Sequence, residues 1–211
     1  MIILLISVIS YLAGSLPVGY IITKLKTNKD IRNIGSGNIG ASNVKRILGL
    51  RYALLVVFLD AVKAVLPLYI VKYHLVFQNQ DLINCIAAFF LVIGHIYSIF
   101  LKLEGGKGVA TYIGVMAVLL PLELSIFLAI YLILLILTRH TSMSSIIDVS
   151  LFPFIVLIIN GITQESAPYL ILSVFLAIII IIKHKDNIRR LRQGKEPKFI
   201  LKDKINRIYA K

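Results

Sequence analysis

The stretch VATYIGVMAVLLPLELSIFLAIYLILLILT, residues 109–138, decides how many times this chain crosses a membrane. Its only formal charge is Glu123, and it is too long for one comfortable helical span but short for two. Pro121 stands near its middle, where the missing N–H group favours a helix break. The sequence therefore predicts a turn at Pro121-Leu122-Glu123, which leaves a short helix over 109–120 with a rise of only about 18 Å.

The rest of the chain has the composition of a polytopic membrane protein. Of its 211 residues, 58% are hydrophobic, well above the content of ordinary soluble domains. Further apolar runs that we interpret as membrane spans lie at 2–22, 52–71, 82–101, 146–160 and 168–182. No basic residue precedes the first apolar run, so we interpret it as a retained span and not as a signal peptide.

Basic residues are distributed unevenly between these runs. All but two of the 23 Lys and Arg residues lie in 23–51, 102–107, 139–145 or the tail from residue 183. Short cytoplasmic segments carry the excess of Lys and Arg, so 23–51 and the tail are both expected in the cytoplasm. An even number of spans must then separate them, which requires 109–138 to cross twice.

These observations predict an all-α polytopic membrane protein with seven transmembrane helices, the N-terminus outside, the C-terminus cytoplasmic and the fourth helix short. Residues 1–211 are expected to form a single integral membrane domain, with 183–211 as a basic, interfacial cytoplasmic tail. The apolar tail residues available to rest on the interface are Ile188, Leu191, Phe199, Ile205 and Ile208. Insertion topology and attraction to anionic lipid also explain the net charge of +13 without any chemistry.

A glycine-rich loop, GSGNIGASNVKR at 35–46, lies in the first cytoplasmic segment. It combines backbone freedom, short donors and positive charge in Gly35, Gly37 and Gly40, in Ser36, Asn38, Ser42 and Asn43, and in Lys45 and Arg46. Exposed backbone N–H groups beside cations suit a phosphate. An ordinary turn with capping Ser and Asn residues remains the alternative interpretation.

A second glycine loop, EGGKGVAT at 104–111, precedes the short helix. Gly105, Gly106 and Gly108 surround Lys107 at the helix N-terminus, where unpaired N–H groups and the helix dipole favour an anion. It is not a nucleotide-binding P-loop, because that motif places Ser or Thr directly after the lysine. The alternative is one more positive-inside lysine beside a flexible turn.

A polar helix face is expected at the start of the tail, where His184, Asn187 and Arg190 are spaced to lie together. This face fits a substrate site, and it also fits a solvated basic helix. The serine-rich segment 139–145 is expected as a third cytoplasmic loop. All the glycine-rich and polar segments therefore fall on one side of the membrane, where they can line a shared cleft.

Charged and reactive residues inside the spans are few. Asp60 and Lys63 are expected to form a structural ion pair, and His95 fits a packing role and a site role equally. Cys85, the single cysteine, is expected to be a packing residue. No metal-ligand cluster or paired carboxylates are apparent, so neither a metal nor a cofactor is expected. No His is followed five positions later by an acidic residue, which excludes the acyltransferases with a His-x4-Asp signature.

Taken in order, the polar segments resemble the bacterial membrane family that transfers an acyl group from acyl phosphate to glycerol 3-phosphate. The matching segments are GSLPVGY (14–20), DIRNIGSGNIGASNVKR (30–46), DAVKA (60–64), GHIYSIFLKLEGGKGVAT (94–111), RHTSMSS (139–145) and HKDNIRRLRQGKEPK (184–198). This chain departs from the family pattern at Ile39, Ser42, Ala64 and Tyr97-Ser98-Ile99, without loss of a charge or a hydroxyl. The resemblance implies the first acylation of phospholipid synthesis, with lysophosphatidate and phosphate as products.

The resemblance also implies residue roles. It gives catalytic roles to Ser36, Lys107, His184 and Asn187. It gives substrate-binding roles to Gly37, Asn38, Gly40, Asn43, Arg46, Gly105, Gly106, Gly108, Thr111, Ser142, Ser145 and Arg190. No covalent acyl-enzyme is needed, because acyl phosphate carries a good leaving group that can itself accept the hydroxyl proton.

The expected partners are acyl phosphate, glycerol 3-phosphate and the lipid bilayer, with no nucleic acid. The expected location is the inner membrane of a bacterium, with the active site facing the cytoplasm. A transporter of a phosphorylated metabolite is the alternative from another class, although the chain lacks paired repeats. A lipid-binding scaffold with a basic tail is a third reading, but it leaves the glycine loops without a role.

Overall fold

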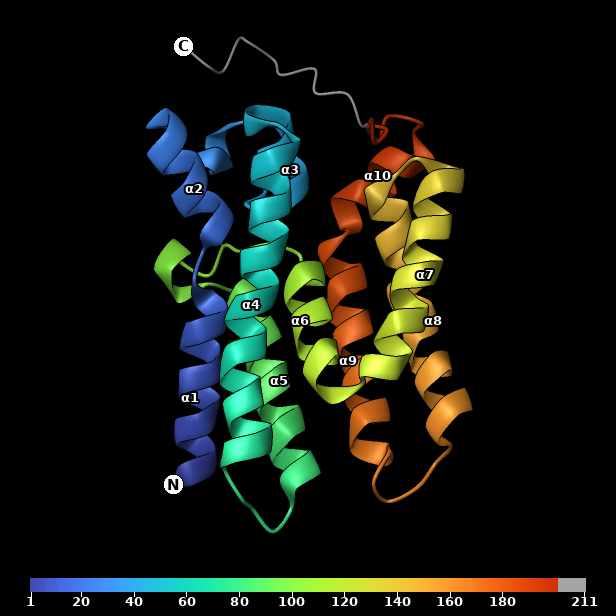
Figure 1. Cartoon of the computed structure of the whole chain (residues 1–211). Helices are drawn as coiled ribbons and strands as arrows, with labels where there is room; N and C mark the ends of the chain where they lie inside the picture. The colour runs from blue at the N-terminus through green and yellow to red at the C-terminus, as the bar shows by residue number, and fades with distance from the viewer. Residues whose placement is uncertain (201–211) are drawn as a thin grey trace.

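The computed structural model describes residues 1–200, which form helices and loops without a strand (Figure 1). The helices are α1 (Ile2–Ser15), α2 (Val18–Thr27), α3 (Ala41–Leu48), α4 (Leu50–His74), α5 (Gln80–Ile96), α6 (Val109–Leu119), α7 (Pro121–Thr138), α8 (Thr141–Asn160), α9 (Ala167–Lys183) and α10 (Lys185–Arg192), with the 3-10 turns η1 (Ile31–Asn33) and η2 (Ile99–Leu101). Two residues of the predicted interfacial tail, Ile205 and Ile208, lie outside the described residues.

Several helices are long and apolar enough to cross a membrane. Five such segments occur within residues 1–200: Ile2–Thr27, Leu50–His74, Gln80–Leu101, Pro121–Thr138 and Thr141–Asn160. The pair α9 and α10, bent by 58°, makes a sixth if it counts as one span, and α6 is a shorter apolar helix. The prediction of an all-α polytopic membrane protein is confirmed, while the seven-span count and the orientation of the termini stay predictions.

The predicted break near Pro121 is confirmed, but it lies slightly earlier than expected. Helix α6 ends at Leu119, and only Leu120 separates it from α7, which begins at Pro121. The predicted turn residues Leu122 and Glu123 are therefore helical. Proline is well suited to a first helical position, because the N–H group it lacks would have no partner there. With 11 residues, α6 rises about 17 Å, which agrees with the predicted short helix.

Two other segments differ from their predicted form. The first apolar run does not form one helix, because α1 ends before Leu16-Pro17 and α2 starts at Val18. Proline restricts the residue before it and removes a helical hydrogen bond, which explains the break. The serine-rich segment 139–145 is not a loop either: α8 already begins at Thr141 and places Ser142 and Ser145 in its first two turns.

Small residues allow the membrane helices to approach closely. A Cβ atom on Gly14 of α1 would lie 2.0 Å from the carbonyl oxygen of Leu91 in α5. A Cβ atom on Gly94 of α5 would lie 2.2 Å from the carbonyl oxygen of Tyr11. Such close backbone packing is typical of helices inside a bilayer. The hydrophobic effect does not drive association there, and small residues let the helices gain van der Waals contact instead. The pair α1 and α5 therefore forms a rigid support for the loop that follows α5.

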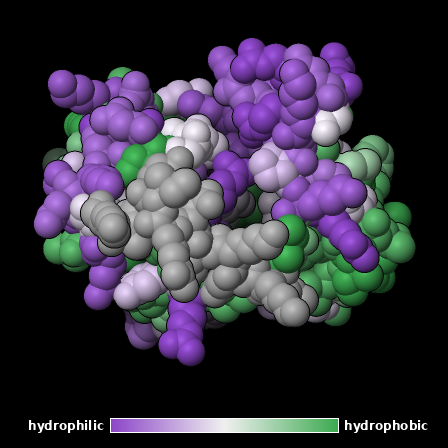
Figure 2. All heavy atoms as spheres, turned by 90° about the horizontal axis from the view of Figure 1, so that it is seen from above, coloured by the Kyte–Doolittle hydropathy of each residue, from purple (hydrophilic) through white to green (hydrophobic). Residues whose placement is uncertain are grey.

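The polar segments gather at the end of the bundle opposite residue 1. Helices α2, α3 and α10 lie at this end, at the top of Figure 1, and the glycine loop before α6 approaches it from deeper in the bundle. Seen from above, hydrophilic residues dominate this face outside the grey atoms (Figure 2). The fold thus brings four sequence segments to one polar end.

Candidate active site

The first glycine loop is held from inside by Asn43 of α3. The Asn43 side chain is buried; its Oδ1 accepts from the N–H group of Ser36 (3.0 Å) and its Nδ2 donates to the carbonyl oxygen of Ile34 (2.9 Å). Gly35 and Gly37 have φ values of 63° and 70°, which favour glycine. The loop is therefore an ordered structure that presents the exposed residue Ser36.

Asn38 and Gly40 complete this loop. Oδ1 of Asn38 accepts from the N–H group of Gly40 at 2.9 Å, and Gly40 is the N-cap of α3. The side-chain oxygens of Asn38 and Asn43 are thus both engaged in shaping the loop. Arg46 follows on α3, half-buried, and burial lowers the pKa of its guanidinium below the ordinary value.

The second glycine loop packs tightly on the end of α5. A Cβ atom on Gly105 would lie 2.1 Å from the carbonyl oxygen of His95, and one on Gly106 would lie 2.1 Å from Nε2 of His95. The N–H group of Gly106 donates to the carbonyl oxygen of His95 at 3.0 Å. Gly108, with φ of 90°, is the N-cap of α6. Close packing, and not flexibility alone, therefore explains why glycine occupies these positions. The N–H group of Gly106 is also already hydrogen-bonded within the protein.

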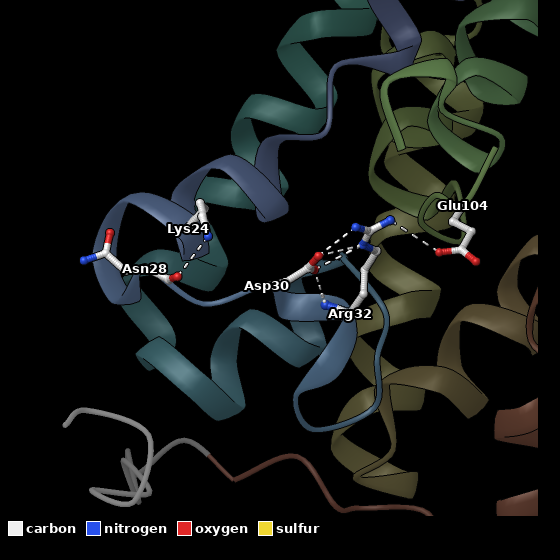
Figure 3. A network of polar contacts seen from close by, with 5 residues as sticks. All are labelled: Lys24, Asn28, Asp30, Arg32 and Glu104. Atoms are coloured by element: carbon white, nitrogen blue, oxygen red, sulfur yellow. Dashed lines mark hydrogen bonds and ion pairs between the residues drawn. The ribbon is translucent and has the colours of Figure 1, made fainter. Parts of the chain in front are cut away.

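Arg32 links the segment before the first glycine loop to the start of the second loop (Figure 3). Its guanidinium pairs with Asp30 at 2.7 Å and with Glu104 at 3.5 Å. Nearby, Lys24 Nζ donates to the carbonyl oxygen of Asn28. The Glu104 side chain is 72% exposed, so its pairing with Arg32 contributes little energy. The contact nevertheless shows that the segment before the first loop lies beside the start of the second loop.

Lys107 is held at the centre of the polar end. Its Nζ donates to Oδ1 of Asn187 in α10, a residue 80 positions away in the sequence. Burial lowers the pKa of Lys107 to about 8; Glu196 opposes the shift, while the nearby charges of Arg190 and Arg46 add to it. Lys107 is therefore half-buried and hydrogen-bonded, and its role in binding a substrate stays a prediction.

Glu196 is the residue that sequence reasoning missed. Its Oε1 accepts from Ser142 Oγ and from Asn187 Nδ2, each at 2.6 Å, and its Oε2 accepts from Arg190 Nε at 2.7 Å. Burial raises the pKa of this carboxyl, but the three hydrogen bonds outweigh burial and hold the pKa below its usual range. An acidic residue inside a strongly basic tail was the available signal.

His184, at the junction of α9 and α10, is buried and neutral. Nδ1 lies 2.8 Å from the carbonyl oxygen of Ile180, which can only accept, so Nδ1 carries the hydrogen and Nε2 is an acceptor. Burial, and then the charge of Lys107, lowers the pKa of His184 to about 4. The predicted helix face is confirmed in part, because Asn187 and Arg190 both bind Glu196.

Two further predicted residues, Ser145 and Thr111, lie on the helices α8 and α6. Ser145 Oγ donates to the carbonyl oxygen of Thr141 at 2.8 Å, within α8. Thr111 is fully buried in the first turn of α6, and its Oγ1 has no hydrogen-bond partner among the described residues. The structure thus gathers Ser142, Asn187 and Arg190 about Glu196, with Lys107 bonded to Asn187. The Ser36 loop directly precedes α3, whose Arg46 interacts electrostatically with Glu196 and Arg190.

The site as a whole carries excess positive charge. Three half-buried cations, Arg46, Lys107 and Arg190, interact electrostatically with the carboxylate of Glu196, and Asp186 adds a smaller interaction with Lys107. Partly buried cations are screened less by water than exposed ones, so an uncompensated excess favours a bound anion. The negative charge of a phosphate group suits this excess.

Comparison with known proteins found one family along nearly the whole chain. A family model described as glycerol-3-phosphate acyltransferase matches residues 4–194. A glycerol-3-phosphate acyltransferase of Bartonella henselae is 39% identical over 92% of this chain and 90% of its own length. One from Thermoanaerobacter sp. (strain X514) is 41% identical over 95% and 98%, respectively.

Two solved structures share the fold. Both are crystal structures of PlsY (YgiH), an integral membrane glycerol 3-phosphate acyltransferase. The glycerol 3-phosphate form has a TM-score of 0.87 at 32% identity and covers 95% of this chain and 96% of that one. The lysophosphatidic acid form has a TM-score of 0.84 at 30% identity and covers 96% and 98%. The agreement extends over nearly the whole fold.

Proposed function

This chain belongs to the glycerol-3-phosphate acyltransferase family, and we propose that it transfers an acyl group from acyl phosphate to glycerol 3-phosphate. The products are lysophosphatidate and inorganic phosphate. The observation that carries the proposal is the group of three half-buried cations about the carboxylate of Glu196, at the polar end of the bundle. Both proposed substrates carry a negatively charged phosphate group at neutral pH, so the excess of positive charge in the site suits them.

The reaction requires no protein nucleophile. A hydroxyl of glycerol 3-phosphate attacks the acyl carbon, a new C–O bond forms, and the bond from the acyl carbon to the phosphate oxygen breaks. The hydroxyl proton passes to the departing phosphate, so atoms and charge balance. The protein contributes alignment of the two substrates and preorganised donors for the charge that develops on the carbonyl and leaving oxygens.

Different residues of the site are proposed to bind each substrate. We assign Ser36, the amide of Asn38 and Lys107 to the acyl phosphate. The amide of Gly37, which the resemblance also assigns to this substrate, already donates to the carbonyl oxygen of Ile34 at 3.1 Å. Arg46 and Ser145 would hold glycerol 3-phosphate, and neutral His184 would accept a hydrogen bond from its hydroxyl through Nε2. Glu196 would keep Asn187 and Arg190 in place, because it already binds both side chains.

The same proposal includes the membrane topology. With α6 as a short fourth span, the chain would cross seven times, with the N-terminus outside, the C-terminus cytoplasmic and the active site facing the cytoplasm of a bacterial inner membrane. The basic segment 183–211 would rest on the anionic membrane surface. The gathering of hydrophilic residues at the α2, α3 and α10 end supports this orientation (Figure 2).

The proposal is tested with the purified protein reconstituted in lipid vesicles. We expect palmitoyl phosphate and glycerol 3-phosphate together to give phosphate and lysophosphatidate in equal amounts, measured by colorimetry and mass spectrometry. Palmitoyl phosphate alone should release no burst of phosphate, because no acyl-enzyme forms. Folded protein that yields no lysophosphatidate would overturn the proposal, and uptake of unmodified glycerol 3-phosphate would identify a transporter instead.

A further inference from the structure

A buried ammonium group lies where three helices meet beneath the second glycine loop. Nζ of Lys63 in α4 is 2.7 Å from Oδ1 of Asp60, 2.7 Å from the carbonyl oxygen of Leu16 at the end of α1, and 3.0 Å from Nδ1 of His95 in α5. The contacts to Leu16 and His95 are hydrogen bonds, and the contact to Asp60 is an ion pair. The side chains of Lys63, Asp60 and His95 are only 6%, 3% and 4% exposed.

These contacts fix the state and the direction of the His95 ring. Because an ammonium group only donates, Nδ1 of His95 accepts, and the ring hydrogen is on Nε2. The charges of Asp60 and Lys63 cancel each other, so a neutral ring leaves the group without net charge, which a buried site strongly favours. The sequence predicted the ion pair correctly, but it gave no sign that the pair binds His95.

The other edge of the same ring meets the glycine loop. A Cβ atom on Gly106 would lie 2.1 Å from Nε2 of His95, so the ring fills the space where a side chain would be. The N–H group of Gly106 also donates to the carbonyl oxygen of His95 at 3.0 Å. His95 therefore contacts Gly106 with both its ring and its backbone, directly before Lys107.

We propose that Lys63 and Asp60 lock His95 as a positioning residue, and that His95 in turn sets the place of the Gly105-Gly106-Lys107 loop in the active site. Apolar side chains would pack in the bilayer interior without the desolvation cost of an ion pair. By contrast, the hydrogen bond from Lys63 to Nδ1 orients the ring, while the ion pair with Asp60 and the hydrogen bond to Leu16 hold the ammonium group in place. The part of this inference that concerns turnover rests on the proposed acyltransferase function.

Two variants test the inference without leaving a lone charge in the membrane. His95→Phe keeps a ring against Gly106 but removes the acceptor for Lys63. The double variant Asp60→Asn/Lys63→Met removes both charges together. Lys72→Met is the matched control, because Lys72 is on the same helix and its Nζ donates to the carbonyl oxygen of Val118, at the other end of α6 from the loop.

The first readout is independent of activity. An amine-reactive reagent labels Lys107 of the full-length protein across a pH series, and mass spectrometry of peptides gives the midpoint. For the wild type and Lys72→Met we expect a midpoint near 8, set by burial and by Arg190, Arg46, Glu196 and Asp186 around the amine. In both test variants the midpoint should rise by about one pH unit or more, toward an ordinary lysine, because the loop leaves its place.

The second readout is turnover per folded protein. Both test variants should lose about tenfold or more in kcat with a smaller change in KM, because Lys107 no longer meets the transition state. A general loss of folding would lower the amount of monodisperse protein and leave the labelling midpoint of the folded fraction unchanged. If either test variant folds and keeps both the wild-type midpoint and the wild-type kcat, the inference is overturned. A wild type without turnover would refute the proposed function, and the labelling series would still decide the role of His95.

Discussion

Nδ2 of Asn187 donates a hydrogen bond to Oε1 of Glu196 at 2.6 Å, across the turn that follows α10. The other atom of the same amide, Oδ1, accepts from Lys107. Asn187 therefore has a fixed orientation, with its donor on the carboxylate and its acceptor on the cation. Through this one amide the tail controls the position of the cation in the second glycine loop.

Glu196→Gln should weaken both the fold and substrate binding. The substitution removes the charge that three donors share and that offsets the cations Arg46, Lys107 and Arg190. We expect a loss of about 1 to 3 kcal/mol in unfolding free energy and a markedly lower activity. Thermal unfolding in detergent with activity assays measures both, and Glu165→Gln, an exposed position between α8 and α9, is the control. If Glu196→Gln keeps the stability and activity of the wild type, the proposed role of Glu196 in the site is contradicted.

Lys107→Ala should nearly abolish turnover while the protein still inserts and folds. The variant loses the cation that the Asn187 amide presents to the substrates, and a preorganised charge at a phosphate contributes about 100-fold or more to rate. The measurement is kcat/KM for both substrates in reconstituted vesicles. Lys102→Asn, at an exposed position with φ of 57°, changes a charge next to the same loop and should retain activity. Similar losses in the two variants would argue for a general charge effect.

The pH dependence of activity should show a loss on the alkaline side. The pKa of Lys107 is about 8 in the free protein, so raising the pH through 8 removes the positive charge, and kcat/KM should fall. His184, with a pKa of about 4, remains neutral over this range and adds no change. Lys107→Arg should be slower at neutral pH but lose this alkaline fall, because arginine stays charged. A profile that is flat from pH 6 to 10 in the wild type would contradict the role of the lysine charge.

Asn43→Ala should disorder the first glycine loop. The buried amide satisfies the Ser36 N–H group and the Ile34 carbonyl oxygen, and its removal leaves both without that partner. We expect a cost of about 1 to 3 kcal/mol in stability and a higher KM for acyl phosphate. Unfolding and steady-state kinetics check this, with Asn79→Ala, exposed at the start of α5, as the control. An unchanged KM would show that the loop keeps its form without Asn43.

Features that depend on residues close together in the sequence could be predicted from the sequence alone. Apolar runs and the break at Pro121 follow from hydropathy and from a missing N–H group, and both are present in the structure. The ion pair of Asp60 and Lys63 follows from a spacing of three on one helix, and their atoms lie 2.7 Å apart. The prediction that the serine-rich segment 139–145 is a loop was wrong, because polar residues in the first turn of a helix have the same composition as a loop.

By itself, the sequence determined the membrane class of the protein, its helical segments and the residue types gathered at its polar end. Only the tertiary structure decided which of those residues meet: Lys107 with Asn187, Ser142 with Glu196, and Lys63 with His95. The physical reason is that helix propensity and hydropathy act over a few residues. A contact between residues 32 to 80 positions apart depends on how whole helices pack and turn toward one another.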